Sequence, residues 1–325
     1  MQRKIGMMRI RFIFAILFLS ACQGEIQVTT FPTLSGEPPL VIAHRGASGI
    51  LPEHTMEAYT RAIEMGANYI EPDLVITKDG HLVARHDRYL SGSTNVSVLP
   101  EFADRRRADP HHTGKDWFIE DFTLAEVKTL KARQPRDGRS TAFDDQYDIP
   151  TFEEILALVA SRNTDTRQIG IYPETKQPTA FASVGLQHDG TLLRLLSQYG
   201  YESVAAPIFI QSFELENLKR LKKTTNLKLV FLTQTLPDFR LIAQTVDGVG
   251  PDKKMLFDET AQDTGFVAAA HAAGLAVHPW TFRDDAPNPT FLDIDAELKA
   301  YYALGVDGVF SDFPDTALRV RQDIN

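Results

Sequence analysis

The sequence predicts an α/β protein that folds as one (β/α)8 TIM barrel over residues 40–325, with a small insertion after the second strand. Three observations lead to this fold. Apolar runs with strand character alternate about eight times with helical patterns, which is typical of a parallel barrel. Gly66, Gly200, Gly274 and Gly305 each follow a predicted helix, where a left-handed cap favours glycine. The chain has 325 residues, 43% of them hydrophobic, and barrels commonly reach this length as one domain.

The first 22 residues predict an export signal. A basic start is followed by an apolar centre, Phe12 to Leu19, that is too short to cross a bilayer as a helix. The string Leu19-Ser20-Ala21-Cys22 resembles a bacterial lipobox, in which the cysteine is lipidated and becomes the mature N-terminus. The alternative is an ordinary cleaved signal with an incidental cysteine. Cys22 is the only cysteine, so the exported domain has no internal disulfide.

The lipobox predicts a protein of the cell envelope, held to the membrane by a lipid anchor. Gln23 follows the cysteine, and a residue other than aspartate there usually accompanies outer-membrane sorting in Gram-negative bacteria. We therefore expect the periplasmic side of the outer membrane or the cell surface. Residues 23–39 are rich in threonine and proline and predict a tether. The net charge of −9 argues against nucleic acid as a partner.

Beyond the tether, strand-like and helical patterns alternate. The predicted strands cover residues 40–44, 67–76, 168–174, 207–212, 227–232, 246–250, 275–280 and 306–311. The predicted helices cover residues 54–65, 151–161, 189–199, 213–224, 238–245, 261–273, 293–304 and 314–322. An open doubly wound sheet is the second choice, but the chain has no glycine-rich phosphate loop of the dinucleotide-binding type. Residues 88–148 fit no strand–helix pair and predict the insertion, with one helix at about 123–132.

Three carboxylates stand near the ends of predicted strands. Glu71 and Asp73 are two residues apart on one strand, so their side chains point to the same face. Glu174 ends the next barrel strand. Two buried like charges are costly without a compensating cation, and an all-oxygen set suits Ca²⁺ or Mg²⁺. The alternative is a rim of carboxylates paired with basic residues. Pro72 between the first two carboxylates removes one ladder N–H and makes the local strand geometry uncertain.

Two histidines and an arginine follow strand-like runs and should face the same end of the barrel. His44 and His86 are a candidate acid–base pair, since each would reach a group bound beside the carboxylates. Arg45 has the planar guanidinium that binds two phosphoryl oxygens at once. Lys176 lies two residues after Glu174 and shares its strand face if the strand extends that far.

Several strings in the chain resemble the glycerophosphodiester phosphodiesterase family, especially its secreted bacterial branch. They are AHRGASG (43–49), LPEHT (51–55), TKDGHLV (77–83), HDRYL (86–90), IGIYPE (169–174), VHPWTFR (277–283) and SDFPD (311–315). The resemblance covers nearly all of residues 40–320. It implies a metal-dependent enzyme that hydrolyses glycerophosphodiesters to sn-glycerol 3-phosphate and an alcohol, and it implies a barrel with a small insertion.

The resemblance also assigns residues. It implies one divalent cation, Ca²⁺ before Mg²⁺, held by Glu71, Asp73 and Glu174. It implies that His44 and His86 transfer protons while a glycerol hydroxyl attacks phosphorus, and that water then opens a cyclic glycerol phosphate. Substrate-binding candidates are Arg45, Lys176, Glu53 and Trp280; Glu53 could equally cap the first helix.

Two other functions are compatible with an exported barrel. One is a surface lipoprotein that binds a partner and has lost its chemistry, but intact histidines and carboxylates argue against it. The other is a phospholipase acting on intact membrane lipids, which would need an apolar rim that the polar insertion does not visibly supply. The head group of the substrate, the oligomeric state and the roles of the two histidines stay open.

Overall fold

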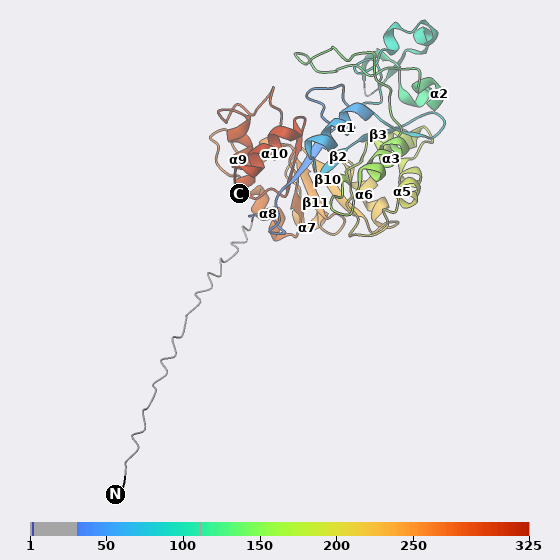
Figure 1. Cartoon of the computed structure of the whole chain (residues 1–325). Coiled ribbons are helices and arrows are strands. Elements are labelled where there is room, and N and C mark those ends of the chain that lie inside the picture. Colours follow the sequence, from blue (N-terminus) through green and yellow to red (C-terminus); the bar gives the residue numbers. More distant parts are fainter. Residues whose placement is uncertain (1, 3–30, 111, 325) are drawn as a thin grey trace.

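The structure of the chain, a computed structural model, describes residue 2 and residues 31–110 and 112–324. These residues form a barrel with helices on its outside and the insertion at one end (Figure 1). The predicted signal and Cys22 lie outside the described residues. None of the helices in the described part combines the length and the apolar character needed to cross a membrane.

Eight strand positions of the described chain form the barrel wall, and two of them are interrupted. They are β1 (Leu40–His44), β2 and β3 (Tyr69–Glu71 and Asp73–Ile76), β7 and β8 (Gly170–Ile171 and Glu174–Thr175), β9 (Phe209–Ser212), β10 (Lys228–Thr233), β11 (Gly248–Pro251), β12 (Ala276–Val277) and β13 (Gly308–Ser311). Each lies within or close to a strand that the sequence predicts.

The strands pair in parallel around a closed ring. One set of pairings runs β13-β1-β2-β7 and the other runs β12-β11-β10-β9-β8-β3. The ring closes beside β13, where Asp307 N donates to Val277 O at 2.9 Å and Phe310 N donates to Pro279 O at 3.1 Å. This closure confirms the predicted barrel and excludes the open sheet.

Pro72 occupies the break between β2 and β3, as its missing N–H would require. Before the proline, β2 pairs with β1 and β7; after it, β3 pairs with β8. The strand β4 (Leu82–Ala84), the strand-like run before His86, lies outside the eight predicted barrel strands and pairs with β3 in the antiparallel direction. The doubt about local geometry at Pro72 is therefore resolved as a change of partners within one strand position.

The helices outside the barrel follow the predicted order, with one addition at residues 178–183 that the sequence did not predict. They are α1 (Met56–Met65), α3 (Phe152–Arg162), α4 (Pro178–Ser183), α5 (His188–Gln198), α6 (Leu215–Lys222), α7 (Phe239–Ile242), α8 (Phe266–Ala272), α9 (Ile294–Leu304) and α10 (Pro314–Gln322). Helix α3 begins at a capping box in which Thr151 and Glu154 satisfy each other's backbone N–H groups. Helix α8 is shorter than predicted because Gly265, with φ of 77°, precedes its first turn.

Buried side chains fill both the interior of the barrel and the layer between strands and helices. The interior holds a separate cluster of Ile42, Tyr172, Phe209, Val230 and Phe310. The Tyr172 ring stacks on Phe209 with centroids 5.0 Å apart. These rings occupy the barrel interior, so a ligand has access to the strand ends but not to a channel through the middle.

The insertion has less regular structure than the barrel. It contains α2 (Leu124–Val127), a hairpin of β5 (Arg107–Asp109) and β6 (His112–Asp116), and the 3₁₀ turns η1 (Val96–Val98), η2 (Pro100–Arg105) and η3 (Ile119–Asp121). The predicted helix at 123–132 is wrong after residue 127, because Lys131 and Ala132 pair with other extended segments. The hairpin strands are polar and lack the alternation that predicts a strand.

The last residues of the predicted tether lie against the barrel. Leu34 N donates to Asp307 Oδ1 at 2.7 Å, and Arg321 Nη1 donates to Pro39 O at 2.7 Å. Asp307 immediately precedes β13, so the chain joins the barrel at the amino ends of its strands. The insertion and the site described below lie at the other end.

Candidate active site

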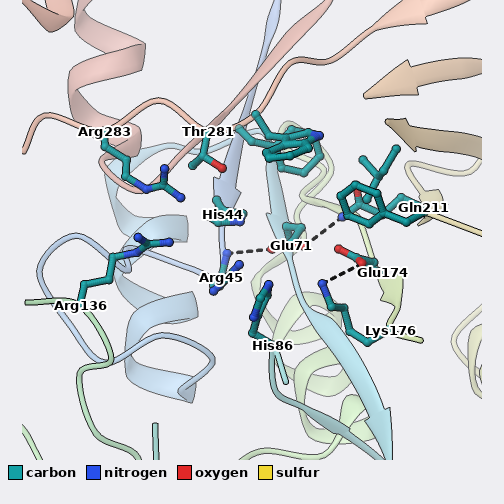
Figure 2. Close-up of a pocket in the computed structure, with 14 residues that line it drawn as sticks. His44, Arg45, Glu71, His86, Arg136, Glu174, Lys176, Gln211, Thr281 and Arg283 are labelled. Carbon is teal, nitrogen blue, oxygen red and sulfur yellow. Dashed lines mark hydrogen bonds and ion pairs between the residues drawn. The ribbon is translucent and has the colours of Figure 1, made fainter. Parts of the chain in front are cut away.

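A pocket of about 220 Å³ opens at the carboxyl ends of the barrel strands (Figure 2). The residues that line it are His44, Arg45, Glu71, His86, Arg136, Glu174, Lys176, Gln211, Phe213, Leu232, Trp280, Thr281, Arg283 and Phe310. Most of the site residues predicted from the sequence are in this set. The carboxyl ends of barrel strands are where enzymes of this fold hold their reacting groups.

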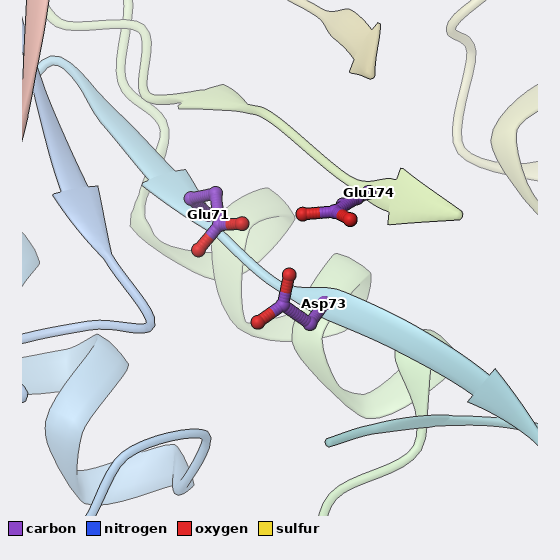
Figure 3. A group of neighbouring side chains, drawn as sticks. All are labelled: Glu71, Asp73 and Glu174. Atoms are coloured by element: carbon purple, nitrogen blue, oxygen red, sulfur yellow. The ribbon is translucent and has the colours of Figure 1, made fainter. Parts of the chain in front are cut away.

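Glu71, Asp73 and Glu174 converge beside the pocket (Figure 3). One carboxylate oxygen from each lies within 4.8 Å of the others, and all three residues are buried. Glu71 ends β2, Asp73 begins β3, and Glu174 begins β8 directly opposite Asp73 in the parallel register. The break at Pro72 therefore leaves the first two carboxylates on one face, as their spacing predicts.

Neighbouring groups fix the orientation of these carboxylates. Glu71 accepts hydrogen bonds from Gln211 Nε2 and from the backbone N–H of Arg45, both at 2.9 Å. Asp73 Oδ2 lies 2.9 Å from His54 Nε2. The side chain of Gln211 leaves its own oxygen, Oε1, buried without a hydrogen-bond partner among the described residues.

Burial and the charges of neighbouring groups shift the pKa values of all three carboxylates. Burial and the charge of Asp73 raise the pKa of Glu71 well above its usual value. Burial, with Asp73 again adding to the effect, raises the pKa of Glu174 to about 8. Burial alone would raise the pKa of Asp73 too, but Lys176 and Arg45 hold it well below its usual value. The protein alone therefore compensates one of the three negative charges well and two of them poorly.

A hard divalent cation fits this cluster. Its donors are carboxylate oxygens, they converge, and they carry negative charge that the surrounding protein leaves uncompensated. Oxygen-only sites of this kind select Ca²⁺ or Mg²⁺ rather than zinc. Glu71, Asp73 and Glu174 are the residues that would hold the ion.

His44 is buried at the end of β1 and is held by a carboxylate that directly follows β13. Its Nδ1 lies 2.6 Å from Asp312 Oδ1. His44, Arg283 and Arg139 hold the pKa of Asp312 well below its usual range, against the effect of burial. Burial, with Arg45 nearby, lowers the pKa of His44 to about 3. A neutral His44 therefore donates from Nδ1 to Asp312, which leaves Nε2 as a proton acceptor.

His86 follows β4 and reaches the pocket from a different direction. It is half-buried, and its Nδ1 lies 2.9 Å from Asp87 Oδ1. Burial and the positive charge of Arg45 lower the pKa of His86, while Asp87 acts in the opposite direction. Each histidine thus has one ring nitrogen beside an aspartate.

Arg45 is fixed in place by two carboxylates. Its Nη1 donates to both oxygens of Glu53, at 3.0 and 2.9 Å, and its Nε lies 3.1 Å from Asp73 Oδ2. Burial alone would raise the pKa of Glu53, but Arg45 brings it down to about 2. The described contacts of Glu53 are with Arg45 rather than with the pocket, and the cap of α1 is Thr55. Arg45 itself has a φ of 60°, a backbone strain of the kind found at functional sites.

Lys176 and Trp280 lie on the same side of the pocket as Glu174. The Lys176 Nζ is 2.9 Å from Glu174 Oε1 and 3.8 Å from Asp73 Oδ1. Trp280 packs edge to face against Phe213, with ring centroids 5.6 Å apart, and its indole N–H donates to Gly250 O at 2.8 Å. Phe213 is 41% exposed, so the two rings form an apolar wall at the mouth.

The structure also brings to the site residues that were not predicted as site residues, among them His54, Gln211, Asp312, Arg136, Arg139 and Arg283. His54 and Asp312 both stand in motif strings quoted above, and Asp312 directly follows the end of β13, which was an available signal. Arg136 and Arg139 belong to the irregular insertion. No periodicity or spacing in that segment indicates that they reach the barrel.

The comparisons with known proteins agree on the family. A model described as the glycerophosphoryl diester phosphodiesterase family matches residues 44–316. A glycerophosphodiester phosphodiesterase of Arabidopsis thaliana is 33% identical, covering 89% of this chain and 88% of the relative. One of Haemophilus influenzae is 32% identical, covering 88% of this chain and 90% of the relative.

Solved structures show the same fold. A putative glycerophosphoryl diester phosphodiesterase from Silicibacter pomeroyi has a TM-score of 0.66 at 23% identity, over 90% of this chain and 98% of that one. An Oleispira antarctica phosphodiesterase, solved with its product sn-glycerol-3-phosphate, has a TM-score of 0.63 at 23% identity, over 89% and 99% of the two chains. From the family match and these relatives, the chain belongs to the glycerophosphoryl diester phosphodiesterase family and is a phosphoric diester hydrolase.

Proposed function

We propose that the protein hydrolyses glycerophosphodiesters to sn-glycerol 3-phosphate and an alcohol, with His44 and His86 as the proton-transferring pair and one divalent cation, Ca²⁺ before Mg²⁺, at the carboxylate cluster. The observation that carries this proposal is the convergence of both histidines, the carboxylates and Arg45 on one pocket. The relatives with the same activity support the substrate class.

His44 is the better placed general base. Asp312 orients its ring and leaves Nε2 as the acceptor, in the manner of an aspartate–histidine pair. In this proposal Nε2 takes the proton from a glycerol hydroxyl as that oxygen bonds to phosphorus. The charge of Asp312 stabilises the imidazolium that forms.

His86 is then the general acid. A bound phosphodiester brings a negative charge next to its ring, and Asp87 is already there, so both favour the protonated form. His86 gives its proton to the oxygen of the departing alcohol as its bond to phosphorus breaks. A cyclic glycerol phosphate remains, and water opens it with the two histidines in exchanged roles.

Positive groups hold the phosphoryl oxygens during both steps. Arg45 is fixed by Glu53 and Asp73 and does not need to reorganise when substrate binds. Lys176 supplies a second cation at the other side of the carboxylates. A bound metal ion would add charge stabilisation for the non-bridging oxygens.

The test is turnover by the metal-free protein and by the same protein after Ca²⁺ or Mg²⁺ is added back. Purified protein should release sn-glycerol 3-phosphate from glycerophosphocholine and from other glycerophosphodiesters, and it should do so only with a divalent cation. Absence of product from every diester with either ion present would rule the function out. Turnover that is unchanged after chelation would contradict the proposed role of the metal ion but not the hydrolase activity.

We also propose that the chain is lipid-anchored at Cys22 in the cell envelope, on the periplasmic side of the outer membrane or at the cell surface. The lipobox string supports this. Cys22→Ser should abolish lipid attachment and leave a soluble or unprocessed form. Equal partitioning of that variant and the native protein into detergent would show that the anchor lies elsewhere.

A further inference from the structure

We infer that Arg136 and Arg283 form a second anion-binding subsite in the pocket, which selects glycerophosphodiesters whose alcohol carries an anionic group, such as the carboxylate of a serine head group. This inference rests on the proposed function, because it names the substrate class of the same pocket. It starts from two arginines that line the pocket but have no part in the proposed chemistry.

The two arginines come from different parts of the chain and meet on one side of the pocket. Arg136 belongs to the insertion, and Arg283 follows the last but one barrel strand, β12. In Figure 2 they lie on one side of His44, whereas Glu71, Glu174 and Lys176 lie on the other. The carboxylates Glu71 and Glu174 and the cation Lys176 are therefore separated from the arginine pair by His44, beside which Arg45 lies (Figure 2).

The hydrogen-bonding capacity of this pair is largely unused. Arg283 Nε donates to Asp312 Oδ2 at 2.9 Å, and within the described chain its two terminal nitrogens have no hydrogen-bond partner. The guanidinium of Arg136 donates no hydrogen bond within the described chain, and its ion-pair partner there is Asp312, 3.9 Å from Nε. Terminal guanidinium nitrogens bind carboxylate and phosphate oxygens in pairs.

The charges around the pair leave a positive excess. Three guanidinium groups, those of Arg136, Arg139 and Arg283, share two carboxylates, Asp312 and Asp285. Asp312 also carries the hydrogen bond with His44. Burial lowers the pKa of Arg136, and the charge of Arg283 lowers it further, so the two cations repel each other. An anion between them would relieve that repulsion, whereas a choline head group would add a third positive charge.

The side chains of Arg136 and Arg283 are 37% and 21% exposed, so an entering ligand can reach both. Because both side chains are partly exposed, the binding free energy gained from an anion should lie at the lower end of the range for charge-assisted hydrogen bonds. A head-group carboxylate should improve kcat/KM by about tenfold.

The experiment compares two substrates that differ by one carboxylate, sn-glycero-3-phosphoserine and sn-glycero-3-phosphoethanolamine. Both release sn-glycerol 3-phosphate, so one assay measures both. The native enzyme should prefer the serine diester about tenfold in kcat/KM. Arg136→Gln and Arg283→Gln should each move that ratio towards one, mainly by lowering the rate on the serine diester.

A matched control is Arg133→Gln. Arg133 lies in the same insertion but pairs with Asp145 at 2.6 Å and does not line the pocket. It should keep the native ratio. Equal losses on both diesters in the Arg136 and Arg283 variants would overturn the inference and assign these arginines to the phosphate common to the two substrates. A native ratio of one or below would also overturn it.

Failure of the inference is separable from failure of the proposed function. His86→Ala should hold both diesters without cleaving them, so calorimetry on this variant gives the ratio of dissociation constants directly. If the native protein hydrolyses neither diester but His86→Ala binds the serine diester more tightly, the subsite stands and the hydrolysis proposal fails. If turnover is normal and the two bind equally, the subsite fails alone.

Discussion

The two walls of the pocket are built in different ways. The acidic wall consists of carboxylates on β2, β3 and β8, whose register is set by backbone pairing between neighbouring strands. The basic wall consists of Arg136 and Arg283, which stand on irregular segments; both pair with Asp312, as does the neighbouring Arg139, which does not line the pocket. The regular wall holds the groups common to the reaction, and the irregular wall holds the groups that we assign to the choice of substrate.

This difference suggests a division of labour between scaffold and insertion. Strand ends fix a side chain through a backbone that is already held by its neighbours, which suits groups that must stay within a fraction of an ångström. A loop can change its sequence without disturbing the barrel. Four experiments test how far the two walls are separate.

The largest effect is expected on the acidic wall. Glu71→Gln should lower turnover by about 10³-fold or more. It weakens the binding site of an ion that would stabilise the charged transition state by several kcal/mol. The same change removes a buried like charge, and Gln211 can turn its amide oxygen, Oε1, towards the new NH₂ group. Without metal, the unfolding temperature of the variant should therefore equal or exceed that of the native protein. A large fall in thermal stability without metal would show that Glu71 is structural.

The next effect concerns the histidines, which stand where the two walls meet. His44→Ala and His86→Ala should each lower turnover on glycerophosphocholine by at least about 10²-fold, because each removes one proton transfer. A diester with a nitrophenol leaving group needs no acid, so it should restore the rate of His86→Ala but not of His44→Ala. Calorimetric titration with Ca²⁺ should give similar affinities for both variants and the native protein. The opposite pattern of rescue would exchange the two roles.

A smaller effect is expected at Asp312, which connects the basic wall to His44. Asp312→Asn keeps the size of the side chain but removes the charge that stabilises a protonated His44. Turnover should fall by about tenfold to a hundredfold, less than in His44→Ala, because the base itself remains. The pH profile should change as well, since the pKa of His44 loses its main raising influence. A loss of turnover with an unaltered profile would indicate a general packing defect.

The smallest effect on catalysis is expected at Arg139, which joins the insertion to the barrel. It donates to Asp312 at 2.6 Å and to Ser48 O at 3.0 Å, and its side chain is buried. Arg139→Gln should lower the free energy of unfolding by about 1–3 kcal/mol, measured by urea denaturation. Arg283 still holds Asp312, so turnover should change less than in Asp312→Asn. A catalytic loss equal to that of Asp312→Asn would mean that the walls act as one unit.

The sequence was sufficient where backbone periodicity determines position. Glu71 and Asp73 were placed together by a two-residue spacing, and Glu174 by its place at the next barrel strand; the structure brings all three within 4.8 Å. The break at Pro72 changed the strand partners but not the face of the side chains. His44 could be placed in the same way because it ends β1.

Where position depends on contacts between distant segments, no local pattern in the sequence predicts it. The helix predicted at 123–132 ends early because extended segments elsewhere in the insertion pair with its last residues. Arg139 reaches Asp312, 173 residues further along the chain, through packing that no local pattern describes. The hairpin of β5 and β6 was missed because its polar residues lack an alternating pattern.

The pairing of β1 with β13 has a consequence for the order of events during synthesis. His44 leaves the ribosome early, yet the carboxylate that orients it, Asp312, is 268 residues away and directly follows β13, the strand that pairs with β1. A chain that has not been completed has neither the partner of β1 nor the partner of His44. The nascent protein should therefore remain inactive until its final segment has emerged, and loss of the last strand should silence a site whose other residues are already in place.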